Sequence, residues 1–136
     1  MPLSGIIELM RRIFKTRYFS RWMRKTDLTE KALCTAIAEM MLGLIDGDLG
    51  GGIIKKRIGL AGRGKRGGAR TLVASNKGNR WFFVFGFEKN DRANISADEL
   101  EALQGLAREL LARTNQQLDE AVVGGALQEI CHDQKT

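Results

Sequence analysis

The chain has 136 residues, of which 43% are hydrophobic, and carries a formal net charge of +6 at pH 7. A chain of this length fits one compact domain that buries roughly two thirds of its unfolded surface. No run approaches the about 18 apolar residues of a membrane span, and the first residues lack the apolar core of a signal peptide. We therefore expect a cytoplasmic protein without membrane contact, with residues 1–9 as a disordered or cloning-derived tail and residues 10–136 as a single domain.

The two cysteines, Cys34 and Cys131, lie far apart in the sequence and match no metal-ligand or redox spacing. We expect both to be free thiols in a reducing compartment. No pattern of ligands indicates a metal or another cofactor.

The first predicted elements are a brief strand near residues 13–14 and a short helix over about residues 16–25. A longer helix is expected from Asp27, because Asp27 and Glu30 have the spacing of a capping box and apolar residues then recur at helical intervals. Gly47 suits the end of that helix.

The middle of the chain predicts neighbouring strands. The run IIKKRIG is short, β-branched and bounded by glycine, while ARTLVAS and RWFFVFGFE flank the turn NKGN. Alternate large side chains would cover both faces of the last of these strands, which places it in the middle of the sheet. One face would carry Trp81, Phe83, Phe85 and Phe87, and the other Phe82 and Val84.

The C-terminal part predicts two more helices. Ser96 and Glu99 have capping-box spacing before a leucine-rich amphipathic segment, and a shorter helix over about residues 116–123 would stop at Gly124. ALQEIC is a candidate edge strand. Helices before and after a run of adjacent strands indicate an α+β domain, with helices packed on one small antiparallel sheet.

Positive charge is concentrated in one part of the chain. Residues 1–95 hold 19 Lys/Arg against 8 Asp/Glu, whereas residues 96–136 hold 3 against 8, and there is no acid between Gly50 and Asn76. Pairing of the hairpin would bring position 70 opposite about position 85 and gather distant bases at its open end. These are Lys65, Arg66, Arg70, Lys89 and Arg92. Such clustering favours a polyanionic partner over the alternative of a solvated basic loop.

The run KKRIGLAGRGKRGGARTLVASNKGNRWFFVFGFEKNDRANIS resembles the RelE/HigB branch of bacterial type II toxin–antitoxin systems. The shared features are a lysine/arginine strand, a glycine-lysine-glycine loop, a glycine-x-arginine strand start and an aromatic strand ending in Phe-x-Lys-Asn, and the resemblance covers about residues 12–131. It implies a RelE-like microbial ribonuclease-type fold and a toxin that cleaves translated messenger RNA on the bacterial ribosome. It also implies a cognate antitoxin partner of the helix-turn-helix type.

The resemblance implies attack by the RNA 2′-hydroxyl without a metal. The single histidine, His132, stands near the chain end, which excludes a mechanism with paired histidines. Arg70 is expected to hold the scissile phosphate with its planar donor fork, Lys65 to transfer protons, and Lys89 to share either role. Positioning of RNA is assigned to Lys55, Lys56, Arg57, Arg63, Arg66, Asn90 and Arg92, although Lys55 and Lys56 alternate across faces, so that at least one should be structural.

Two features depart from the family pattern. The only tyrosine, Tyr18, is far upstream in the sequence, and Ala69 of GGAR stands where a bulkier or aromatic residue is common before the arginine. Phe85 and Phe87 are expected in the core rather than against bases. Two other functions stay open: a ParE-like toxin that acts on DNA gyrase, and a nucleic-acid-binding protein without catalysis. A nucleotide-binding P-loop is excluded, because GRGKRGG lacks the required spacing and precedes a strand.

Overall fold

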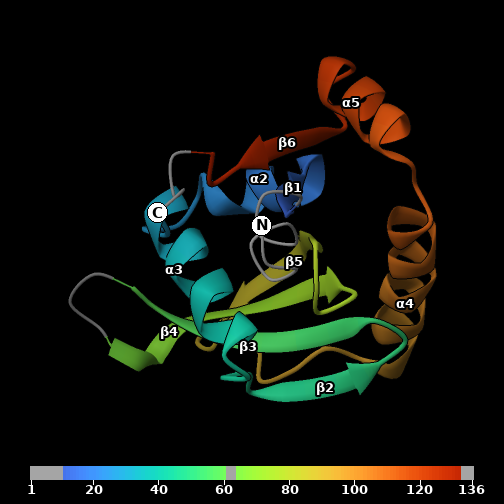
Figure 1. Cartoon of the computed structure of the whole chain (residues 1–136). Helices are drawn as coiled ribbons and strands as arrows, with labels where there is room; N and C mark the ends of the chain where they lie inside the picture. The colour runs from blue at the N-terminus through green and yellow to red at the C-terminus, as the bar shows by residue number, and fades with distance from the viewer. Residues whose placement is uncertain (1–10, 61–63, 133–136) are drawn as a thin grey trace.

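The computed structural model in Figure 1 describes residues 11–60 and 64–132. The expected tail at residues 1–9 lies outside these residues. In chain order the elements are β1 (Arg12–Thr16), α2 (Arg17–Met23), α3 (Glu30–Met41), β2 (Gly47–Gly50), β3 (Ile53–Leu60), β4 (Gly64–Ser75), β5 (Arg80–Glu88), α4 (Ala97–Leu111), α5 (Asn115–Val123) and β6 (Leu127–Ile130).

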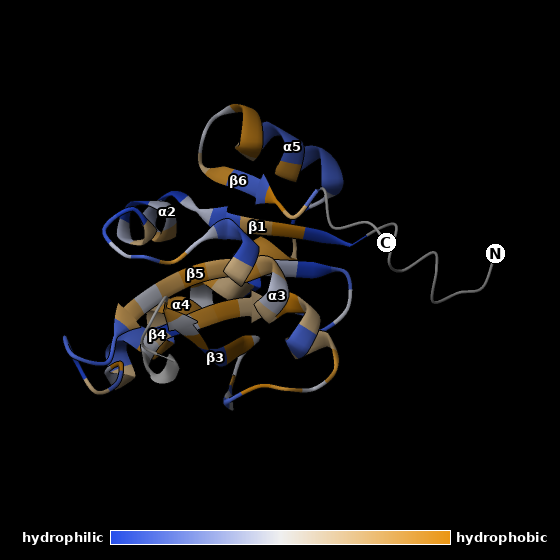
Figure 2. Ribbon diagram, turned by 90° about the vertical axis from the view of Figure 1, so that its left-hand side faces the viewer, coloured by the Kyte–Doolittle hydropathy of each residue, from blue (hydrophilic) through white to orange (hydrophobic). Residues whose placement is uncertain are grey.

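One six-stranded sheet organises the described chain, with the strand order β2-β3-β4-β5-β1-β6. The α+β prediction is confirmed, as are the interior position of β5 and the edge position of β6. The sheet is not wholly antiparallel, however, because β1 pairs with β5 in parallel. In Figure 2 the interior strands carry mostly hydrophobic colours, in keeping with a sheet that is covered on both faces.

Helices cover the two faces of the sheet separately. On one face, α2 and α3 pack through Phe19, Leu33 and Ile37 against a cluster that includes Trp81 and Phe83. On the other, α4 packs against a cluster that contains Leu72, Phe82 and Val84. Below, these are called the α3 face and the α4 face.

The bounds of α3 differ from the prediction at both ends. Thr29, not Asp27, is the N-cap, and its side chain accepts a hydrogen bond from the Ala32 amide at 3.1 Å. The helix ends at Met41, and Gly43 follows with a φ of 86°, a backbone conformation that favours glycine. Gly47 instead begins β2, opposite Lys55. The capping box at Ser96 and the end of α5 at Val123 are as predicted.

A bulge in β5 overturns part of the expected alternation of its side chains. Leu72 pairs with Phe85 but Val73 pairs with Phe83, so that Val84 is an extra residue. Phe85 therefore follows Val84 onto the α4 face, and Gly86 turns to the α3 face. A Cβ on Gly86 would lie 2.3 Å from the Trp22 ring, so only glycine fits there.

The prediction of free thiols was wrong. Cys34 on α3 and Cys131 after β6 form a disulfide, with their Cα atoms 5.7 Å apart despite a sequence separation of 97. The pair was not visible in the sequence because β6 returns to the sheet beside β1, next to α3, only at the end of the chain. None of the helices in the described part of the chain combines the length and the hydrophobicity of a membrane-spanning segment.

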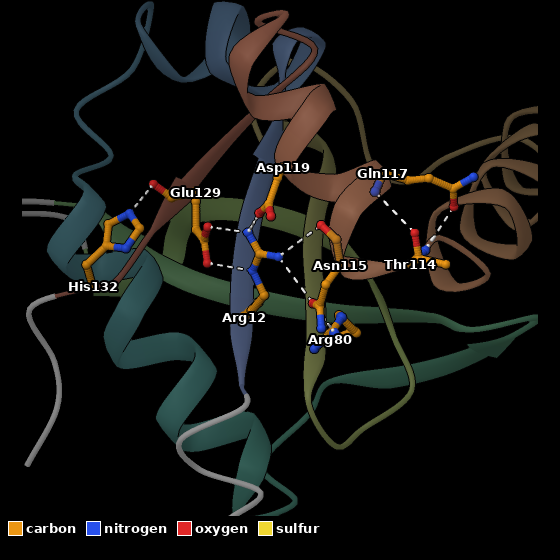
Figure 3. A network of polar contacts seen from close by, with 8 residues as sticks. All are labelled: Arg12, Arg80, Thr114, Asn115, Gln117, Asp119, Glu129 and His132. Carbon is orange, nitrogen blue, oxygen red and sulfur yellow. Dashed lines mark hydrogen bonds and ion pairs between the residues drawn. The ribbon is translucent and has the colours of Figure 1, made fainter.

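A polar network centred on Arg12 holds the C-terminal elements to β1 (Figure 3). The Arg12 guanidinium donates to Glu129 on β6 at 2.7 and 3.0 Å and to Asp119 on α5 at 2.8 Å. Asn115 accepts from both Arg12 and Arg80. The hydrogen bond to Glu129 is the main cause that raises the pKa of Arg12, and burial lowers that of Arg80. This network is structural, because each cation is engaged by groups of the chain itself.

Candidate nucleic-acid interface

Two rows of side chains lie across three adjacent strands on the α4 face. Directly paired residues of neighbouring strands share a face of the sheet and lie about 5 Å apart. Leu72 packs on the α4 side, so its partners Lys55 and Phe85 lie there too. Lys55, Leu72 and Phe85 thus form the first row. The second row lies two residues away from it on each strand and consists of Arg57, Arg70 and Phe87. We call this second row the Arg70 row.

Arg70 is the central member of the Arg70 row. The residue is 9% exposed, and one terminal nitrogen, Nη1, donates to the Gly68 carbonyl oxygen at 3.4 Å. A Cβ on Gly68 would lie 2.2 Å from the Ile58 carbonyl oxygen, so glycine lets β3 and β4 approach closely just before Arg70. The observed partner of Arg70 on β5 is Phe87, two residues beyond the expected position 85.

The bases of β3 separate into different environments. Lys56 is 4% exposed, and its Nζ donates to the Leu44 carbonyl at 2.8 Å and pairs with Glu39 at 2.9 Å. Lys56 is therefore the structural member of the Lys55–Lys56 pair and is withdrawn from the RNA-contacting set. Arg57 remains partly exposed beside Asp46.

Arg57 and Asp46 form a hydrogen-bonded pair at the edge of the interface. The Asp46 carboxylate accepts from the Arg57 amide at 2.7 Å and from its Nε at 3.2 Å. Burial alone would raise the pKa of Asp46, but the hydrogen bonds from Arg57 outweigh it and lower that pKa. These hydrogen bonds to Asp46 restrict the Arg57 side chain, which lies on the strand next to Arg70.

The segment after β5 brings three further candidates to the end of the interface. Lys89 and Asn90 are exposed in the turn that follows Glu88. Arg92 turns back to α4, where it donates to both carboxylate oxygens of Glu99. The Arg92 guanidinium also lies over Phe85 and Phe87, 5.9 and 5.6 Å from the ring centroids. Arg92 is thus held over aromatic rings of both rows.

Three candidates cannot be placed fully. Arg63 lies outside the described residues. Lys65 and Arg66 belong to β4, in the part that continues beyond the last pairing of β4 with β5 at Ala69 and Glu88, and their side chains also lie outside the described part of the chain.

The structure adds Tyr18, which sequence reasoning placed far from the interface. The Tyr18 ring is stacked on Phe85, with ring centroids 5.8 Å apart and planes inclined by 10°, and the residue is 61% exposed. The cause is topological: β1 pairs with β5 only as far as Phe83, and α2 then runs alongside the rest of β5. Its spacing to Phe85 in the sequence gave no signal of this contact.

Neither His132 nor the acidic residues of the described chain indicate a second catalytic or metal site. His132 lies 2.9 Å from the Glu129 carbonyl oxygen beside β6, at the opposite edge of the sheet from β2 (Figure 3). Among residues 11–60 and 64–132 there is no group of three or more His, Cys, Asp or Glu side chains placed to hold a metal ion.

Comparison with known proteins identifies the family of the chain. Residues 11–130 match the family described as the RelE toxin of the RelE/RelB toxin–antitoxin system. The chain belongs to the RelE toxin family. It is therefore a toxin of a toxin–antitoxin system, and membership implies a cognate antitoxin. No curated protein matches the chain.

Proposed function

We propose that this RelE-family toxin is an endoribonuclease that cleaves messenger RNA on the translating ribosome and so inhibits translation. The observation that carries the proposal is the Arg70 row, in which an arginine fixed within an interior strand lies between Arg57 and the aromatic Phe87. Exposed Lys89 and Asn90 follow the end of β5, the strand that carries Phe87. Family membership supports the toxin role.

The proposed chemistry needs no metal. Lys65 or Lys89 takes the proton of the 2′-hydroxyl as general base, and the 2′-oxygen bonds to phosphorus. The bond from phosphorus to the 5′-oxygen then breaks, and that oxygen takes the proton back from the lysine. The products are a 2′,3′-cyclic phosphate and a 5′-hydroxyl. Arg70 donates to the phosphate oxygens, whose negative charge grows in the transition state.

The remaining polar candidates have a positioning role in this proposal. Lys55, Arg57, Asn90 and Arg92 would contact the RNA backbone, together with Arg63 and Arg66. Positioning of the message by the ribosome would supply much of the rate, since fixing two reactants in a productive geometry removes a large entropic cost. The cognate antitoxin, proposed to be a helix-turn-helix protein, would block the same face.

The test is cleavage of a reporter message in a cell-free bacterial translation system, with the new 5′ ends mapped. We expect cuts at codon-related positions on translating ribosomes, no cuts in naked RNA, and a loss of about 10²–10³-fold in rate with Arg70→Ala. Arg70→Lys keeps the charge but not the donor fork, so it should fall between the two. Arg108→Ala, an exposed arginine on the outer side of α4, is the matched control.

An intact message with the folded wild-type toxin would refute the nuclease proposal. Inhibition of DNA supercoiling by gyrase would then be measured next. If Arg70→Ala still cuts at codon-related positions at the full rate, the nuclease proposal stands but the role of Arg70 in it is refuted.

A further inference from the structure

A pocket of about 440 Å³ opens beside the two rows, between Tyr18 and Phe85 on one side and α4 on the other. Tyr18 is an exposed ring, and Phe85 is only partly buried beneath it. The α4 wall is apolar and consists of Leu103, Leu106 and Leu110. A flat apolar group can therefore enter between an aromatic pair and a leucine wall.

Positive charge surrounds this pocket. Arg17 and Arg113 belong to its lining. Arg92 lies over the Phe85 ring from the side of the Arg70 row. Arg92 pairs with Glu99, and Arg113 lies 3.8 Å from Glu109, a carboxylate that is itself 71% exposed. An apolar slot with guanidinium groups around it matches a ligand that is flat in one part and anionic in the next.

We infer that the Tyr18 pocket takes one base of the bound RNA, stacked against the Tyr18 ring, while the adjoining phosphates run along the Arg70 row. This inference rests on the proposed function, because that function makes RNA the ligand. Aromatic rings beside a basic groove bind single-stranded nucleic acid in this way, because every base has a flat face. An apolar side chain of a partner protein would fill the slot but would bring no anion to the guanidinium groups around it.

Phe85 alone would not make this site. It contacts Phe87 with ring centroids 6.3 Å apart and packs with the α4-side cluster, so its ring is largely a support. Tyr18 provides the accessible surface, and its near-parallel contact with Phe85 holds the ring in place. The positioning role therefore belongs to Tyr18.

Because Tyr18 is the only tyrosine of the chain, tyrosine-selective ¹³C labelling gives the ring signals of one residue. The probe is a 2′-O-methylated six-nucleotide RNA of mixed sequence, which cannot undergo attack by its 2′-oxygens. An otherwise identical oligonucleotide with abasic sugars has the same phosphates without bases. We expect saturable upfield shifts of the Tyr18 ring signals with the first probe and not with the second.

Affinity measurements on variants complete the test. Tyr18→Ala should weaken binding of the base-containing probe about 5- to 100-fold and leave binding of the abasic probe within about twofold of the wild type. Tyr18→Phe keeps the ring and should retain wild-type affinity. Val123→Ala, an 89% exposed residue on α5, is the control for a lost surface side chain.

The inference is wrong if the base-containing probe does not bind, or if it binds without moving the Tyr18 signals. It is also wrong if Tyr18→Ala weakens both probes equally. Failure of message cleavage with the Tyr18 shifts still present would instead refute the nuclease and leave the base site standing, so the two failures are distinguishable.

Discussion

Reduction of the Cys34–Cys131 disulfide should cost the protein a large part of its stability. The bond closes a loop with a sequence separation of 97, and restriction of an unfolded loop of roughly 100 residues corresponds to about 4.7 kcal/mol. Native disulfides of small domains contribute about 2–5 kcal/mol when measured. We therefore expect the free energy of unfolding to fall by about 2–5 kcal/mol, out of the roughly 5–15 kcal/mol typical of a domain.

Urea unfolding followed by tryptophan fluorescence measures this change, because Trp81 is 1% exposed in the folded state. With a urea dependence of about 2 kcal/mol per molar, the midpoint should fall by about 1–2.5 M when a reductant is added. The double variant Cys34→Ala with Cys131→Ala should have a urea midpoint close to that of the reduced wild type, and the reductant should not change it. Equal midpoints for the oxidised and reduced wild type would refute the reasoning, as would two titratable thiols in protein prepared without reductant.

Three further outcomes follow from individual contacts. Gly86→Ala should destabilise the fold by about 1–3 kcal/mol in urea unfolding, because the added methyl meets the Trp22 ring; an unchanged midpoint would contradict that contact. The hydrogen bond from Arg92 lowers the pKa of Glu99 to about 2, so the stability that Glu99 contributes should be present above about pH 4.5 and disappear toward pH 2. Melting temperatures of the wild type and Glu99→Gln should therefore converge in acid, and a constant difference would refute this. Arg12→Met should lower the free energy of unfolding by about 1.5–3 kcal/mol, because it leaves the part-buried carboxylate of Glu129 without its partner. The same urea assay measures this against the exposed control Arg108→Met.

Local signals in the sequence predicted the elements well, since their causes are local. The capping box at Ser96 and Glu99 fixes the start of α4 through two reciprocal hydrogen bonds, and both partners lie within four residues. The start of α3 shows the limit of the same reasoning. Asp27 and Thr29 both have side chains suited to an N-cap, and spacing alone did not choose between them.

Features that depend on distant segments were not predictable in the same way. The parallel pairing of β1 with β5 joins residues almost 70 positions apart, and the disulfide depends on where β6 returns. Burial of Lys56 against Glu39 likewise requires α3 to lie over β3. The basic composition of the β3–β4 region thus predicted a cationic surface, but not which of its cations face solvent.

The bulge at Val84 explains why the candidate interface differs most from its prediction. In a regular strand Phe85 would share a face with Trp81 and Phe83, and would pack under α3. The extra residue moves Phe85 to the face that carries the Arg70 row, where the ring meets Tyr18. A single irregularity therefore joins the aromatic and cationic parts of the interface. Because a bulge has no sharp signature in one sequence, the cationic residues of this site were identifiable, but the contribution of Tyr18 and the common face were not.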